Sequence, residues 1–266
     1  MNIPSITLIY FSPTGTTKTI VEEIAHGIHA ERVEVIDCTK PSIRAEKPLT
    51  FRDELVILGA PVYSGRIPTE AADYFKTLSA QKTPAVLVAV YGNRAYEDAL
   101  KELHDIAINA GFLPVAGGAF IGEHSFSSES APIAHGRPDS TDVQKAREFG
   151  TKIKEKLQKI ENSEGIGALH VPGNFPYRER TSLPKVAPVT DTAICNLCGE
   201  CVSVCPTAAI SKDDMTQTDE QKCIVCCACI KICPLDARKM ENPFLQEVAG
   251  RLQKMCQERR ESETYL

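Results

Sequence analysis

The 266-residue sequence has no apolar run long enough to cross a bilayer, so no membrane span is expected. Its N-terminus lacks the basic segment of a secretory signal and enters a short apolar run directly, which favours a cytoplasmic protein. The formal net charge of −5 argues against nucleic acid as a partner, because such surfaces need clustered basic residues. Neither G-x-x-x-x-G-K-[ST] nor G-x-G-x-x-G after a strand occurs, so no motif indicates a P-loop or a dinucleotide-binding loop.

Cysteine is scarce over most of the chain and concentrated in one segment. Only Cys38 and Cys256 lie outside residues 195–233, which hold the other nine of the eleven cysteines. This distribution favours a reducing compartment and a local metal function. The segment reads CNLCGECVSVCP from Cys195 and CIVCCACIKICP from Cys223, and each copy has the spacing C-x2-C-x2-C-x3-C-P. It is an internal duplication rich in thiolate ligands.

This spacing is typical of paired iron-sulfur clusters. Three cysteines at three-residue intervals can surround one face of a cubane cluster, while the fourth, before proline, reaches the other cluster. We therefore assign one 4Fe-4S cluster to Cys195, Cys198, Cys201 and Cys233, and a second to Cys223, Cys226, Cys229 and Cys205. Structural zinc is the main alternative, although its sites usually show C-x2-C pairs and four ligands each. A disulfide framework is less favoured, since no secretory signal precedes the segment.

Cys227 stands where the first copy has Gly199. We expect it to be a small buried neighbour of the ligands, with ligand exchange as the alternative.

The N-terminal segment has the pattern of a strand, a hydroxyl-rich turn and a helix. Residues 5–11 (SITLIYF) form a near-continuous apolar run, as in a buried parallel strand. SPTGTTK follows, and after it apolar residues recur at helical spacing. Backbone N–H groups and the helix dipole would face this turn, so it can bind a phosphate. The same turn also fits an ordinary helix N-cap.

The alternation of strands and helices continues along the chain. We expect further strands at 32–38, 54–60, 85–91 and 113–121, with helices near 69–79, 95–110 and 141–161. Five strands alternating with helices predict an α/β fold with a doubly wound, five-stranded parallel sheet. Ligands bind such sheets at the carboxyl ends of the strands, where the loops 12–17, 61–68 and 91–96 lie.

On these motifs, residues 1–163 resemble a flavodoxin, since SPTGTT matches the S/T-x-T-G-x-T phosphate loop of that family. The resemblance implies FMN as the cofactor, with its phosphate held by Ser12, Thr14, Gly15, Thr16 and Thr17. It implies that two further loops border the isoalloxazine ring through Pro61, Val62, Tyr63, Ser64, Gly65, Tyr91, Gly92, Asn93, Arg94 and Tyr96. The GNRAY segment also resembles the flavin loop of flavodoxin-like activator proteins. The chain has no tryptophan, so the Trp that often stacks on the flavin is replaced, and we expect Tyr63 to take its place.

The remaining segments have simpler expectations. The loop 122–140 reaches the same edge of the sheet, where His124, Ser125, His135 and Arg137 could lie near the flavin. A helix cap formed by residues 137–140, with solvated histidines, is the favoured reading. Residues 164–190 are rich in glycine and proline and are expected to form a linker. A small α+β ferredoxin-like domain is expected at 191–241, followed at 242–266 by a helix with an apolar stripe and an exposed charged tail.

The whole chain resembles the flavodoxin–ferredoxin fusion proteins of anaerobic bacteria and archaea. This resemblance implies an electron-transfer protein that moves electrons between two 4Fe-4S clusters and FMN, converts two-electron into one-electron traffic, and exchanges electrons with a low-potential redox partner protein. The alternative is an enzyme, an FMN-dependent reductase of a small-molecule substrate fed by its own clusters. The sequence leaves open whether FMN and clusters meet within one chain or across a homodimer.

Overall fold

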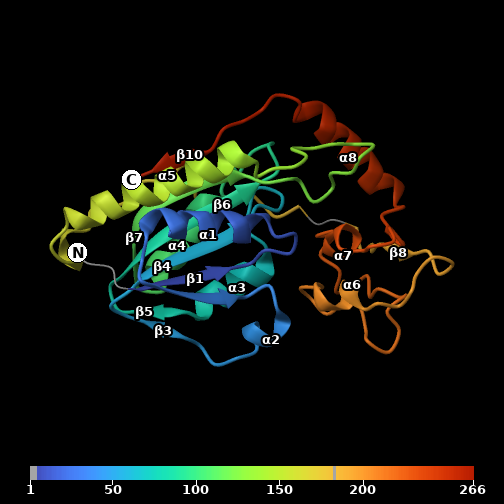
Figure 1. The fold of residues 1–266 in the computed structure, drawn as a ribbon, viewed down its shortest axis with the longest axis horizontal. Helices are drawn as coiled ribbons and strands as arrows, with labels where there is room; N and C mark the ends of the chain where they lie inside the picture. The colour runs from blue at the N-terminus through green and yellow to red at the C-terminus, as the bar shows by residue number, and fades with distance from the viewer. Residues whose placement is uncertain (1–4, 182–183) are drawn as a thin grey trace.

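A computed structural model describes residues 5–181 and 184–266 of the chain. Residues 1–4 of the expected first domain and 182–183 of the expected linker lie outside the described residues. The central sheet has the strand order β10-β7-β6-β4-β1-β2 (Figure 1). Its strands are β1 (Ser5–Tyr10), β2 (Arg32–Asp37), β4 (Leu55–Pro61), β6 (Thr83–Tyr91), β7 (Phe112–Ile121) and β10 (Glu263–Tyr265).

The first five strands of this sheet are all parallel to their neighbours. Numbered among themselves along the chain, they have the spatial order 2-1-3-4-5, which is the doubly wound order with its switch point beside β1. The expected five-stranded parallel sheet is confirmed. The near-continuous apolar runs form these strands because both faces of a parallel sheet are covered.

Helices cover both faces of the sheet (Figure 1). One face carries α1 (Thr16–Ile28) and α5 (Ser140–Gln158), and the other carries α3 (Thr69–Thr77) and α4 (Ala99–Asn109). Helices α1 and α5 pack backbone to backbone, since a Cβ on Gly27 would lie 2.0 Å from the Arg147 carbonyl oxygen. A Cβ on Gly150 would lie 2.1 Å from the Ile24 carbonyl oxygen. Glycine is therefore required at both positions.

Small elements complete the first domain. They are the short helix α2 (Pro41–Arg44), the parallel pair β3 (Thr50–Phe51) and β5 (Ser79–Ala80), and the 3₁₀ turn η1 (Ser163–Gly165).

The cysteine-rich segment forms a small α+β unit, as expected. Its two copies each contain a four-residue helix, α6 (Glu200–Ser203) and α7 (Ala228–Lys231). The strands β8 (Val189–Thr190) and β9 (Arg238–Lys239) pair antiparallel and join the beginning of the unit to its end.

The C-terminal segment crosses from the cysteine-rich unit back to the sheet (Figure 1). Helix α8 (Pro243–Met255) is capped by Asn242, whose side chain accepts from the Leu245 N–H. The tail then forms β10, which pairs antiparallel with β7 through Glu263–Ala119 and Tyr265–Gly117. The charged residues 258–263 are largely exposed, as expected, but the sequence did not indicate that the end of this tail adds a sixth, antiparallel strand to the sheet. The three residues of β10 are too few to show an alternating strand pattern, but the open edge of β7 offers them backbone partners.

Among the described residues, no helix has the length and apolar character needed to span a membrane.

Candidate functional site

The turn after β1 is arranged to receive an anion. The N-cap residue of helix α1 is Gly15, which is left-handed (φ 85°) and offers no side-chain cap, and the first turn of the helix carries no acidic residue. The Ser12 hydroxyl accepts from the Lys18 N–H at 3.0 Å, which closes the turn. In the described part of the chain, the buried Thr17 hydroxyl has no hydrogen-bond partner. A helix N-terminus with glycine as its N-cap residue and an unpartnered hydroxyl in its first turn fits the phosphate that the sequence predicts here.

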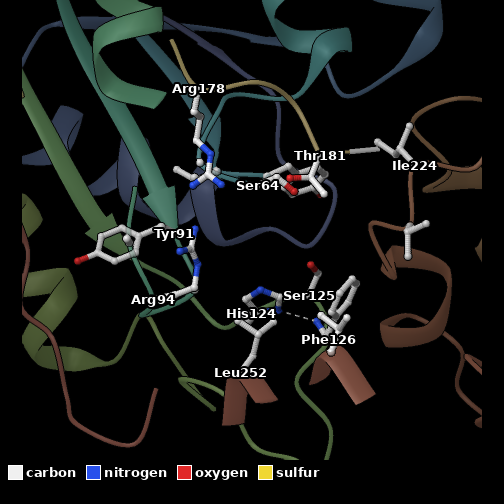
Figure 2. Close-up of a pocket in the computed structure, with 17 residues that line it drawn as sticks. Ser64, Tyr91, Arg94, His124, Ser125, Phe126, Arg178, Thr181, Ile224 and Leu252 are labelled. Carbon is white, nitrogen blue, oxygen red and sulfur yellow. Dashed lines mark hydrogen bonds between the residues drawn. The ribbon is translucent and has the colours of Figure 1, made fainter. Parts of the chain in front are cut away.

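A cavity of about 270 Å³ lies at the carboxyl edge of the sheet (Figure 2). Two of the predicted loops line it, through Val62, Tyr63, Ser64, Gly65, Tyr91, Gly92 and Arg94. The first loop is a tight turn in which Tyr63 and Arg66 exchange backbone hydrogen bonds of 2.8 and 3.1 Å. Ser64 (φ 52°) and Gly65 (φ 78°) are both left-handed, as a type I′ turn requires. The loop 122–140 meets the second loop, since a Cβ on Gly92 would lie 2.4 Å from the His124 ring.

Three residues expected at the ring, Pro61, Asn93 and Tyr96, do not line this cavity. The Asn93 side chain instead bonds to the C-terminal segment, with Nδ2 donating to the Cys256 and Glu258 carbonyls at 2.9 and 2.8 Å. The Tyr96 hydroxyl lies 2.7 Å from a Glu263 carboxylate oxygen and 2.9 Å from the Tyr265 hydroxyl. These side chains support the loop from behind.

His124 lines the cavity, although the sequence favoured a solvated residue. Its Nδ1 accepts a hydrogen bond from the Phe126 N–H at 3.0 Å. Burial, assisted by Lys231 and Arg94, lowers the pKa of His124 to about 4. The imidazole is therefore neutral at pH 7, with its proton on Nε2.

The other expectations for this loop fit a structural role. Asp139 caps α5 in a capping box, as expected. Arg137 is buried and forms an ion pair with Asp142, with Nε to Oδ2 at 2.7 Å. His135 is exposed and lies 3.5 Å from Glu123.

The segment expected to be a linker contributes to the cavity through Arg178 and Thr181. Asp98 fixes this segment by accepting the Arg178 N–H at 2.7 Å and two donors of Asn174 at 2.8 and 3.0 Å. Burial alone would raise the pKa of the Asp98 carboxyl group, but these hydrogen bonds outweigh it, and the pKa is lowered. Glu102 binds Arg66 and Arg180 of the same network. No motif in the glycine- and proline-rich sequence could have indicated this role.

The wall opposite the flavodoxin-like loops comes from the C-terminal half of the chain. Ile224 and Val225 line it, between Cys223 and Cys226, and Val248 and Leu252 of α8 lie beside them. The sequence could not have indicated this, because it does not say how the two units meet.

Polar contacts of Lys231 and Arg44 also join the two units. Lys231 Nζ lies 2.7 Å from a Glu123 carboxylate oxygen. The Arg44 guanidinium donates to the Pro206 carbonyl.

The first predicted set of cysteines surrounds a small cavity of its own. Cys195, Cys198, Cys201 and Cys233 all line it. The Ala237 N–H donates to Cys233 Sγ at 3.2 Å, and the Arg238 guanidinium lies 3.7 Å from Cys201 Sγ. Four thiols around one cavity, with N–H donors directed at sulfur, fit an iron-sulfur cluster.

The second predicted set also comes together. Burial raises the pKa values of the Cys223, Cys226 and Cys229 thiols, and Cys205 adds an electrostatic contribution to all three. Cys205 therefore lies beside the other copy of the motif. Across residues 5–181 and 184–266, no group of three His, Cys, Asp or Glu side chains has the spacing needed to hold a single metal ion.

Known family models match one segment in each half of the chain. A model described as a flavodoxin domain matches residues 7–110, and a model described as a 4Fe-4S dicluster domain matches residues 187–234. The chain carries a flavodoxin domain followed by a 4Fe-4S dicluster domain. The flavodoxin domain implies FMN, and the dicluster domain implies 4Fe-4S chemistry. The protein is therefore an iron-sulfur flavoprotein that acts in electron transfer.

Solved structures similar to the flavodoxin domain include flavodoxins from several sources. A flavodoxin from the domain Archaea is 16% identical, with 58% of this chain and 99% of that chain covered and a TM-score of 0.38. A Streptococcus pneumonia TIGR4 flavodoxin is 16% identical, with 57% and 99% covered and a TM-score of 0.41. A Fusobacterium nucleatum flavodoxin bound to flavin mononucleotide is 14% identical, with 58% and 97% covered and a TM-score of 0.37. No curated protein matches the chain.

Proposed function

We propose that this iron-sulfur flavoprotein transfers electrons between two 4Fe-4S clusters and FMN within one chain, and exchanges them with an external redox protein. The proposal is carried by one observation: Ile224 and Val225, from the cysteine motif, line the same cavity as the flavodoxin loops. Tyr63 lies at this boundary, close to Cys226 and Cys227. Burial, and then these two cysteines, raise the pKa of its hydroxyl. The second cysteine set therefore adjoins the flavin pocket without any intervening element.

The cofactors would be held by the residues that the motifs indicate. Ser12, Thr14, Gly15, Thr16 and Thr17 would bind the FMN phosphate, and the loops 62–65 and 91–94 would border its ring. The first cluster would be held by Cys195, Cys198, Cys201 and Cys233, and the second by Cys223, Cys226, Cys229 and Cys205. Bound FMN accepts two electrons, whereas each cluster exchanges one, so the combination converts between the two modes.

The partner protein would meet the first cluster. Cys198 is exposed, and the neighbouring Leu197 is 58% exposed, so this cysteine set reaches the surface while the second set is largely buried. The two sets then form a path from the surface to the flavin.

Anaerobic reconstitution tests the proposal. The protein should bind about eight iron atoms and one FMN per chain. When the oxidised protein is mixed with less dithionite than its cofactors can accept, the cluster absorbance should bleach first and return as the flavin absorbance bleaches. Reduced clusters that never reduce a bound flavin would refute the proposal.

A second candidate, a reductase of a small substrate, is favoured by the neutral His124 in the cavity, since its Nε2–H can donate to a bound group. His124→Gln should then abolish turnover of any substrate while cluster-to-flavin transfer persists. Unchanged turnover in this variant would exclude the role.

A further inference from the structure

The flavin cavity carries positive charge that no carboxylate lining it offsets. Two guanidinium groups line it, those of Arg94 and Arg178, and no described lining residue is Asp or Glu. His124 contributes no charge at pH 7, because its pKa lies near 4. Figure 2 shows Arg94 and Arg178 reaching into the cavity from two different segments, the flavin loop and the segment after the flavodoxin domain.

One carboxylate serves both arginines. Glu97 Oε1 lies 2.8 Å from Arg94 Nη1, and Glu97 Oε2 binds Arg178 Nη1. Together the three side chains have a formal charge of +1. Glu97 and Arg178 pack against the Tyr63–Arg66 turn, since a Cβ on Gly65 would lie 1.8 Å from Glu97 Oε2 and 2.8 Å from Arg178 Cδ.

The wider network around these three side chains has the same formal charge of +1. It consists of four arginines and three carboxylates: Arg66, Arg94, Arg178, Arg180, Glu97, Asp98 and Glu102. Asp98 fixes the Arg178 backbone at 2.7 Å, which limits how far this guanidinium can move out of the cavity. Each charge is therefore held in place before any ligand binds.

We infer that Arg94 and Arg178 raise the redox potential of FMN bound in this cavity, an inference that rests on the proposed function. Reduction of the flavin ring would take two electrons, one from each of two reduced clusters, and one proton from solvent. The ring would then carry one negative charge. Fixed cations beside the ring stabilise that charge, because water does not screen them fully in a half-buried pocket. The oxidised, uncharged ring gains no comparable stabilisation. The arginines thus favour electron flow from the clusters to the flavin.

Arg94→Gln and Arg178→Gln, each in the holoprotein, test the inference. Each should weaken the preference for reduced over oxidised FMN about tenfold, which lowers the two-electron midpoint potential by about 30 mV. Spectroelectrochemical titration measures that potential, and cluster signals in the same sample report the iron sites. Arg178→Lys keeps the charge and should retain most of the potential. Arg32→Gln, an exposed position on β2 remote from the cavity, should change nothing.

The outcomes distinguish a failure of this inference from a failure of the proposed function. An unchanged flavin potential in both Gln variants, with FMN and iron retained, overturns the inference and leaves the proposed function intact. A wild-type protein that binds no FMN overturns both.

Discussion

The Asn93 side-chain amide donates a hydrogen bond of 2.9 Å to the Cys256 carbonyl, which lies 163 residues further along the chain. Two further hydrogen bonds reach the same segment: Asn93 Nδ2 donates to the Glu258 carbonyl at 2.8 Å, and the Arg260 N–H donates to Asn93 Oδ1 at 2.9 Å. Asn93 is buried and left-handed (φ 63°). The C-terminal segment is therefore attached to the loop that supplies Gly92 and Arg94 to the cavity.

Asn93→Ala should destabilise this attachment. The change leaves two carbonyls and one N–H without their partner and places alanine in a left-handed conformation, so we expect a loss of about 2–4 kcal/mol in the free energy of unfolding. FMN affinity should fall as well, since the loop loses its support. Urea unfolding and flavin fluorescence measure the two effects. Asn109→Ala, at the exposed end of α4, is the matched control.

A change of less than about 0.5 kcal/mol in Asn93→Ala would show that these hydrogen bonds add nothing beyond those the free groups make to water.

The crossed ligand assignment predicts opposite effects for two cysteines. Cys205→Ala should remove the cluster that adjoins the flavin, whereas Cys233→Ala should remove the cluster at the surface. Both variants should retain about half of the iron. Only Cys205→Ala should block internal reduction of the flavin, which anaerobic absorbance spectroscopy follows. The reverse result would mean that each copy of the motif supplies all four ligands of its own cluster.

Cys227 should not be a ligand. It is the N-cap of α7 with φ 59°, where the equivalent Gly199 of α6 has φ 79°. Cys227→Gly would relieve about 1 kcal/mol of backbone strain, and it would lose a similar free energy because less apolar surface is buried. The free energy of unfolding should therefore change by less than about 1 kcal/mol. Iron content should stay unchanged, whereas Cys226→Gly should lose one cluster. Equal iron loss in both variants would assign a ligand role to Cys227.

Stability should fall in mild acid through His124. Its pKa is lowered to about 4 in the folded protein, by burial and then by Lys231 and Arg94, against about 6.5 in an unfolded chain. Between these values the unfolded chain binds a proton that the folded protein does not, so acid favours unfolding. We expect a loss of about 2 kcal/mol from about pH 7 to about pH 5.

Urea unfolding at both pH values should show this loss in the wild type and in His135→Gln, which alters an exposed histidine of the same loop. It should be absent in His124→Gln. An identical pH dependence in all three proteins would assign the effect to other groups.

The sequence predicted most of the sheet because a buried strand depends on a local pattern. The cysteine repeat is likewise a local pattern, and the 4Fe-4S dicluster model matches it. A run such as AVLVAVY is a buried strand in almost any context, and the repeat that begins at Cys195 and Cys223 has one common use. The sequence does not show in which direction a side chain of a loop points. The resemblance implies that Asn93 belongs to the flavin loop, but the Asn93 side-chain amide turns to a C-terminal segment whose pairing no pattern indicated. Arg178 and Ile224 reach the cavity only because the two domains meet there, which depends on tertiary packing.

The central claim, that electrons pass between the second cluster and the flavin inside one chain, is tested most directly by the kinetics of flavin reduction. In anaerobic stopped-flow experiments in which a limiting amount of dithionite first reduces the clusters, the first-order rate constant of the subsequent flavin reduction should be the same for dilute and concentrated protein. A rate that rises in proportion to protein concentration would contradict the account, because the electrons would then pass between molecules.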